Sequence, residues 1–152
     1  MKTMMRNHLR LVICCYFALA VGSALAQSYE VGQIWSYKTR PQDPKSTLTI
    51  LRIDNSISLG VVVFISLADV NIQHPYGGVV RSLSPLPFTK AALDKSVIKL
   101  VGQTDKLMSS ETGYWKWKQG QREGKKPTTF MKPVAEVVND LEHGYIGIPR
   151  QP

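Results

Sequence analysis

Alternation of apolar and polar residues predicts two strands at the start of the globular part of the chain. Residues 33–39 mix β-formers with alternation, which places Trp35 and Tyr37 on one face of a strand. Residues 47–53 are dense in Thr, Ile and Leu and predict a second strand. Polar turn residues follow each segment, so consecutive antiparallel strands are expected.

The most apolar stretch outside the leader is residues 60–67, a nearly unbroken β-branched run. Such a run predicts a strand that is covered on both faces and lies centrally in its sheet. Its apolar character continues, with interruptions, as far as Ile72. Residues 74–87, which begin with His74 and are rich in Gly, Ser and Pro, are expected to form a long loop.

Helical spacing of apolar residues predicts two helices in the second half. Thr89 is the expected N-cap of a helix over residues 90–101 that ends at Gly102. Its apolar stripe consists of Leu93, Val97, Leu100 and Val101. Pro133 opens a last helix that Gly144 ends. The stripe of that helix consists of Val134, Val137, Val138 and Leu141.

Residues 109–122 fit two patterns. As a strand, this segment would turn Trp115 and Trp117 inward, whereas as a helix it would place Tyr114, Trp117 and Gln121 on one face. The flanking Ser, Glu and Gln residues favour the helix.

A short fourth strand is expected at residues 128–131, after a loop at 124–127. The predicted fold class is α+β: a small antiparallel sheet of three to four strands with two or three helices packed on one side.

The first 26 residues have the form of a secretory signal peptide. Lys2, Arg6 and Arg10 precede an apolar run that closes on small residues, which predicts cleavage after Ala26. The run is shorter than the roughly 20 residues needed to cross a bilayer, although a retained anchor is the alternative interpretation. Residues 27–152 are then expected to form one globular domain that is periplasmic or secreted.

Removal of the leader changes the charge and the chemistry of the chain. The full sequence has 19 basic and 11 acidic residues, and loss of the three leader cations leaves 16 against 11, a net charge of +5. Cys14 and Cys15 both lie in the leader, so the remainder has no thiol. A disulfide, a zinc–thiolate site and a cysteine nucleophile are thereby excluded.

Few residues suggest catalysis. The two histidines beyond the leader, His74 and His143, lack the three or four ligands in register that a metal site requires, and no cofactor is expected. No serine lies in a Gly-x-Ser-x-Gly or Ser-x-x-Lys arrangement. The enzymatic alternative is a small cell-envelope hydrolase with His74 as the base, oriented by Asp69.

A basic aromatic segment offers a binding surface instead. Trp115 and Trp117 alternate with Lys116 and Lys118, and residues 116–126 contain further cations. Stacking rings beside cations could bind an anionic polymer or acidic headgroups. The simpler interpretation is that one or both tryptophans belong to the core.

The segment Gly-Gln-Ile-Trp-Ser-Tyr-Lys-Thr-Arg-Pro, residues 32–41, resembles the opening of a loose group of small bacterial proteins of unknown function. The likeness extends to Pro87-Phe88, to Gly113-Tyr114 with Trp117, and to residues 130–136. It implies a strand followed by helices, and no activity, cofactor or catalytic residue comes with it.

The resulting hypothesis is an exported, non-enzymatic binding protein with a protein partner in the cell envelope, immunity-like or inhibitor-like in role. Its candidate surfaces are Trp35 with Tyr37 and Arg40, or the loop containing His74 and Tyr76. The alternatives are the hydrolase and the binding of an envelope surface or anionic polymer through residues 116–126. Nucleic acid is not expected as a partner, and a membrane is expected only through an uncleaved leader.

Overall fold

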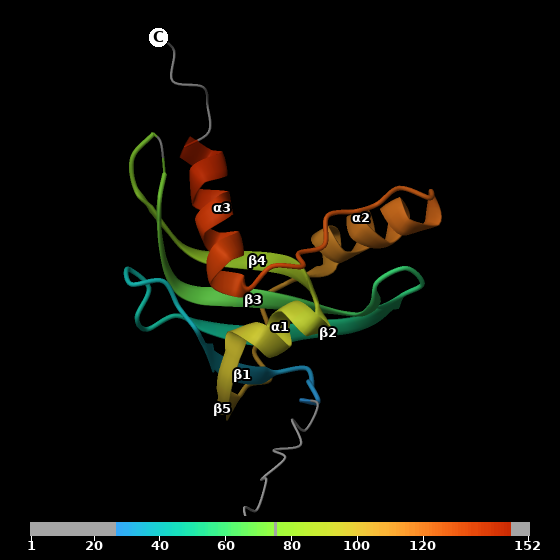
Figure 1. The fold of residues 1–152 in the computed structure, drawn as a ribbon, viewed down its shortest axis with the longest axis horizontal. Helices are drawn as coiled ribbons and strands as arrows, with labels where there is room; N and C mark the ends of the chain where they lie inside the picture. The colour runs from blue at the N-terminus through green and yellow to red at the C-terminus, as the bar shows by residue number, and fades with distance from the viewer. Residues whose placement is uncertain (1–26, 75, 147–152) are drawn as a thin grey trace, which may run out of the picture.

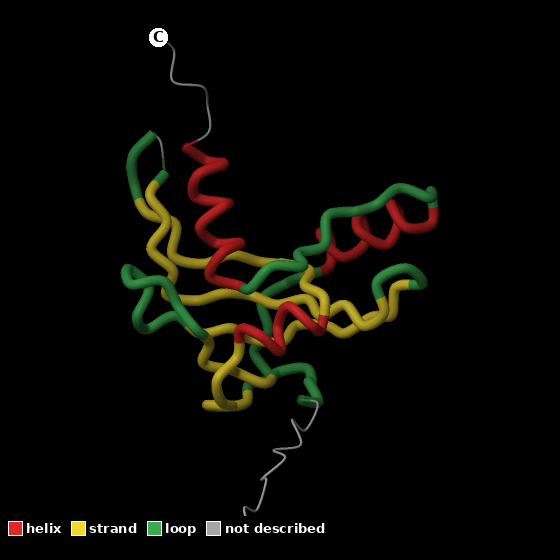
Figure 2. Tube along the Cα trace, viewed as in Figure 1, coloured by secondary structure: helices red, strands yellow, loops and turns green. Residues whose placement is uncertain are grey.

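The computed structural model describes residues 27–74 and 76–146. These residues form, in order, β1 (Gln33–Tyr37), β2 (Thr47–Ser56), β3 (Gly60–Gln73), β4 (Val79–Thr89), α1 (Lys90–Ser96), β5 (Val97–Gln103), α2 (Glu111–Arg122) and α3 (Val134–Ile146). The α+β class is confirmed (Figures 1 and 2), but the sheet has five strands rather than three or four. The predicted signal peptide lies outside the described residues.

The strand order β4-β3-β2-β1-β5 combines a meander with one return. Strands β1 to β4 pair consecutively and antiparallel, as the short turns predicted. The chain then returns through α1 so that β5 pairs antiparallel with the outer side of β1. The first strand of the domain is therefore an interior strand.

Strand β3 is covered on both faces, which confirms the interpretation of its apolar run. Val62 and Phe64 are buried in one cluster, while Val63 and Ile65 are buried in another. Because successive side chains of a strand point to opposite faces, both sides of β3 contact apolar neighbours. The strand also extends well beyond residue 67, through a register shift between Ala68 and Ile72.

The helices cover both faces of the sheet, and the prediction that they pack on one side is wrong. Helices α1 and α3 lie over the face that carries the larger core, and α2 lies over the other (Figure 1). Tyr114 and Trp117 of α2 pack edge-on against Phe64, with ring centroids 5.4 and 5.1 Å apart. A strand that is apolar on both faces requires a cover on each. The buried residues of both clusters all lie between Tyr29 and Val138.

The long loop predicted at residues 74–87 is largely a strand. Beyond the hairpin turn, β4 pairs with β3 through Leu86 and Pro87, opposite Ile65 and Phe64. Prolines are tolerated here because β4 is the edge strand, where a missing N–H group breaks no ladder to a further strand. Pro85 lies within a register shift of the same pairing.

The helix predicted over residues 90–101 ends at Ser96. Thr89 is its N-cap as expected, accepting a hydrogen bond from the backbone N–H of Ala92 at 3.3 Å. The residues that follow are dominated by Val, Ile and Leu and form β5, where Val97 pairs with Tyr37 and Leu100 with Trp35. Pairing with β1 therefore makes these residues a strand although their apolar spacing predicted a helix. Of the four residues in the predicted helical stripe, only Leu93 and Val97 are buried.

The two later helices match their predictions more closely. Residues 111–122 are helical, with Tyr114 and Trp117 buried and Trp115 half exposed. In α3, Val134, Val137 and Val138 are buried. That helix continues past Gly144, the predicted end, and the strand expected at residues 128–131 is reduced to a single bridge between Phe88 and Phe130.

Candidate functional site

The first two candidate binding residues belong to the core. Trp35 and Tyr37 are 8% and 3% exposed, in the cluster beneath α1 and α3. The indole N–H of Trp35 donates to Oε1 of Gln33 at 3.0 Å, and the Tyr37 hydroxyl lies 2.8 Å from Oγ of Ser46. Both polar groups are satisfied internally, so these side chains stabilise the fold and present no surface.

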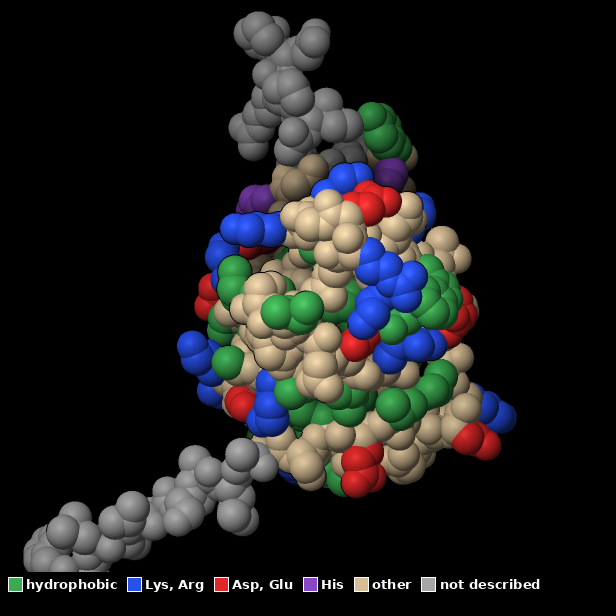
Figure 3. Space-filling view, turned by 90° about the vertical axis from the view of Figure 1, so that its right-hand side faces the viewer, with side chains coloured by type: hydrophobic (Ala, Val, Ile, Leu, Met, Phe, Trp, Pro, Cys, Tyr) green, Lys and Arg blue, Asp and Glu red, His purple; other side chains and the backbone are tan. Residues whose placement is uncertain are grey.

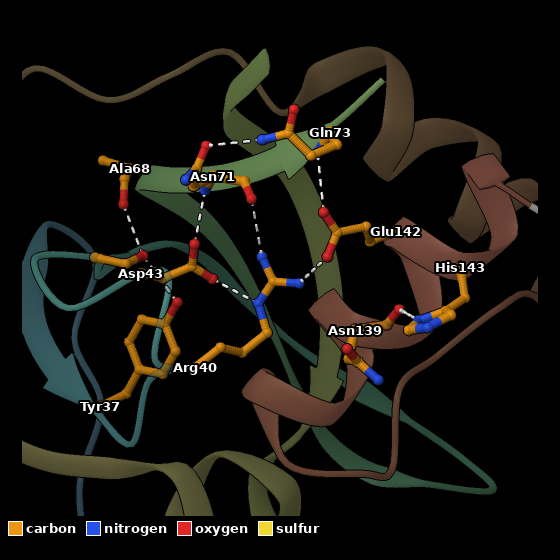
Figure 4. Close-up of polar contacts among 10 residues, drawn as sticks. Tyr37, Arg40, Asp43, Ala68, Asn71, Gln73, Asn139, Glu142 and His143 are labelled. Atoms are coloured by element: carbon orange, nitrogen blue, oxygen red, sulfur yellow. Dashed lines mark hydrogen bonds and ion pairs between the residues drawn. The ribbon is translucent and has the colours of Figure 1, made fainter. Parts of the chain in front are cut away.

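Arg40 lies at the centre of a buried ionic cluster (Figure 4). Its guanidinium donates to Asp43 and to Glu142, each at 2.6 Å, and to the carbonyl of Asn71 at 3.4 Å. Arg40 is 6% exposed and Asp43 is 1% exposed. A buried cation requires such pairing, since an isolated charge in the interior is costly.

The second oxygens of both carboxylates are also bonded. Asp43 accepts from the backbone N–H of Asn71 at 2.7 Å, and Glu142 accepts from that of Gln73 at 2.9 Å. Burial alone would raise the pKa of Glu142, but the bonds from Gln73 and Arg40 outweigh it and lower that pKa. The cluster thus joins the segment after β1, the end of β3 and α3, and all four carboxylate oxygens of Asp43 and Glu142 are bonded within the protein.

His74 and Tyr76 lie at the β3–β4 hairpin, which projects beside the far end of α3 (Figure 1). The Tyr76 side chain is 80% exposed, and its ring centroid lies 5.6 Å from that of His74. The other histidine, His143, is exposed on α3, with Nδ1 2.7 Å from the Asn139 carbonyl oxygen (Figure 4). Among the described residues no group of three His, Cys, Asp or Glu side chains could hold a metal ion.

The candidate residues of α2 point in different directions. The half-exposed Trp115 donates to Glu111 at 2.9 Å, while Lys116 is exposed. Lys118 instead forms an ion pair with Asp54 of β2 at 2.8 Å. Burial alone would raise the pKa of Asp54, but its bonds with Lys118, with the Tyr114 hydroxyl and with the Asn55 N–H lower it. Lys118 therefore fastens α2 to the sheet.

A groove lies where the β2–β3 turn faces the C-terminal end of α2 and the chain beyond it. Its volume is about 580 Å³. One wall is residues 56–59, and the other combines Gln121 with residues from 124 to 131. The lining residues are Ser56, Ile57, Ser58, Leu59, Gln121, Gly124, Lys125, Lys126, Pro127, Thr129 and Met131.

The uncharged polar side chains of the groove bond mainly to the protein itself. The Gln121 amide donates to the Ser56 hydroxyl at 2.7 Å. The Thr129 hydroxyl accepts from the Trp117 indole at 2.9 Å and donates to the Pro127 carbonyl at 3.3 Å. These bonds leave the groove with predominantly aliphatic walls.

The cations of the groove lie together in the loop after α2. Lys125 is largely exposed and pairs with Glu123 at 2.6 Å, which lowers the pKa of that carboxyl. Lys126 is exposed and forms no ion pair with any other described residue. Figure 3 looks onto this end of the molecule, where basic and hydrophobic side chains lie next to one another.

Two apolar side chains of the groove are unusually exposed for their size. Ile57, at the tip of the β2–β3 turn, is fully exposed, and Met131 is 67% exposed. Sequence reasoning selected residues 116–126 but missed the opposite wall, which comes from residues 56–59. An isoleucine and a leucine inside an otherwise polar turn were the available signal.

The described helices include none that is both long and apolar enough to pass through a bilayer. No family model, curated protein or solved structure matches this chain, and the resemblance at residues 32–41 stays a prediction.

Proposed function

We propose that this protein is an exported, non-enzymatic binding protein that takes an anionic ligand with apolar surface into the groove beside the β2–β3 turn. The observation that carries the proposal is Lys126, which has no ion-pair partner among the described residues and lies at a groove with predominantly aliphatic walls. The groove volume of about 580 Å³ falls within the usual range for small-molecule sites.

Charge favours an anion. The chain beyond the leader has a net charge of +5, and both ionisable residues that line the groove are lysines. A cationic site attracts and orients an anion before contact.

The lining also favours binding over catalysis. It includes no histidine, cysteine, aspartate or glutamate. Two of its polar side chains, Ser56 and Gln121, bond to each other, so neither is activated by a neighbouring base. This composition suits a site that holds a ligand without changing it.

The proposal is tested with the anionic fluorescent probe 1-anilinonaphthalene-8-sulfonate and the chain from Gln27. Lys126→Glu should weaken its binding at least about tenfold, because reversal replaces an attraction with a repulsion. Lys106→Glu, which changes an exposed lysine outside the groove, is the matched control and should change the affinity less than about twofold. Equal affinities of the two variants would overturn the proposal.

A second candidate is a protein partner bound through the β3–β4 hairpin, as an immunity-like or inhibitor-like protein would use. The supporting observation is the 80% exposed Tyr76 on a projecting hairpin, since tyrosine is a frequent interface anchor. Capture from periplasmic extract should yield a partner that Tyr76→Ala loses and Lys126→Glu retains. A partner retained by both variants would argue against the hairpin.

A further inference from the structure

The groove has aliphatic walls and no aromatic ring among its lining residues. Ile57, Leu59, Pro127 and Met131 supply its apolar surface. Nucleobases are usually held against aromatic rings, which the lining does not offer. An aliphatic ligand matches these walls better than a planar one.

The bonding within the groove disfavours ligands with many polar groups. Ser56 already accepts from Gln121, and Thr129 bonds to both Trp117 and Pro127. A peptide or a polyhydroxylated ligand would bury donors and acceptors opposite these occupied groups and would lose hydrogen bonds to water. A ligand whose buried part is hydrocarbon avoids that loss.

The charge of the groove is concentrated in one place. Lys125 and Lys126 are consecutive and precede Pro127, while Met131 lies further along the same segment and Ile57 lies on the opposite wall. A ligand that matches this arrangement has one compact anionic group and an aliphatic body.

From these features we infer that the groove binds a single-chain aliphatic carboxylate, a fatty-acid-like amphiphile. This inference rests on the proposed function. The hydrocarbon chain lies along Ile57, Leu59, Pro127 and Met131, and the carboxylate lies at Lys126 with Lys125 beside it.

The same occupant accounts for the exposed apolar residues. Ile57 is fully exposed and Met131 is 67% exposed. A bound hydrocarbon chain would cover both, and methionine adapts readily to a flexible partner. Burial of this surface supplies the driving force for binding.

The test is a calorimetric series with hexanoate, octanoate, decanoate and dodecanoate, each kept below its micelle concentration, and the chain from Gln27. Affinity should increase between about twofold and fourfold for each added methylene, because each one is partly or fully removed from water. Decyltrimethylammonium, which has the same chain length as decanoate and the opposite charge, should bind at least about tenfold more weakly.

Substitutions separate the two parts of the site. Ile57→Ser should reduce the gain per methylene, whereas Lys126→Glu should lower the affinity for every chain length by the same factor. Ile98→Ser, at a half-exposed isoleucine on β5, is the matched control and should change neither quantity. Near-ultraviolet circular dichroism of each variant verifies that the fold is retained.

The outcomes distinguish this inference from the proposed function. Binding of the anilinonaphthalene sulfonate without any dependence on alkanoate chain length would refute the amphiphile and leave the proposed function standing. Failure of both ligands would refute both. Salt-sensitive binding of heparin or of anionic vesicles that Lys126→Glu abolishes, with no alkanoate binding, would also overturn the inference and assign the cations to a larger anionic surface.

Discussion

Arg40 and Lys126 are both cations in segments that the sequence selects for binding, and the fold uses them in opposite ways. Arg40 is enclosed by Asp43 and Glu142, each at 2.6 Å, with little exposure to water. Lys126 lies on an open groove and has no ionic partner among the described residues. The first charge is neutralised by the protein itself, and the second is available to a ligand.

The difference shows that the neighbours of a charge, more than its type, decide what it does. A buried charge without a partner destabilises the fold, so its partners are fixed by the requirement to fold. An exposed charge costs little and can be kept for binding. The predictions below test whether this division between folding and binding holds.

The largest effect is expected at the buried cluster. Arg40→Ala should lower the free energy of unfolding by about 3–5 kcal/mol, because Asp43 and Glu142 would be left buried without their cation. Urea denaturation measures it, with Lys38→Ala, an exposed lysine nearby in sequence, as the control expected within about 0.5 kcal/mol. A loss below about 1 kcal/mol would show that the cluster is not needed for folding.

The pH dependence of stability tests the contribution of Glu142 to the same buried cluster. The pKa of Glu142 is lowered in the folded state, so its contribution is present above the ordinary carboxyl pKa of 4.5 and is lost as the pH falls through the folded value. Glu142→Gln should cost about 2 kcal/mol at pH 7, and its difference from the parent protein should shrink below pH 4.5. Urea denaturation at pH 7, 5 and 3 measures this change, and a constant difference would contradict the lowered pKa.

An intermediate effect is expected where a charge is only partly buried. Asp54 pairs with Lys118 and accepts from the Tyr114 hydroxyl, with 16% of its side chain exposed. Asp54→Asn should lower the unfolding free energy by about 1 kcal/mol, since solvent weakens the ion pair. Thermal melting measures the effect, and Asp105→Asn, at an exposed aspartate, should leave the melting temperature unchanged. Equal changes in melting temperature for the two variants would show that the partly buried ion pair stabilises the fold no more than an exposed aspartate does.

The smallest effect on stability is expected at the groove. Lys126→Glu should change the unfolding free energy by less than about 0.5 kcal/mol while it weakens anion binding. Urea denaturation of the unliganded protein measures it. A decrease of more than about 1 kcal/mol in the unfolding free energy would show that Lys126 helps to maintain the fold, and Lys126 would then not differ from Arg40 in this respect.

Local pattern predicted those parts of the fold that depend on a single element. The β-branched run at residues 60–67 predicted a strand that is buried on both faces, because its side chains are apolar on both faces. Tyr114, Trp117 and Gln121 share a helical face as predicted, and Gln121 reaches Ser56 from that face. Thr89 was identified as a cap from its position before the helix.

The errors arose where an element depends on a distant partner. Prolines 85 and 87 argued against β4 until its place at the sheet edge was known. Leu100 fitted a helical stripe until β1 paired with it. Sequence could not place the two walls of the groove together for the same reason, since they come from segments more than sixty residues apart.

The position of β1 between β2 and β5 has a consequence for a chain that is synthesised from its N-terminus. The earliest strand to emerge gains its second neighbour only when Gln103 has followed, so the outer side of its backbone stays without its partner strand throughout that interval. Unpaired strand edges invite association with other chains. The hazard of misassembly therefore lasts until β5 has been made and has paired with β1.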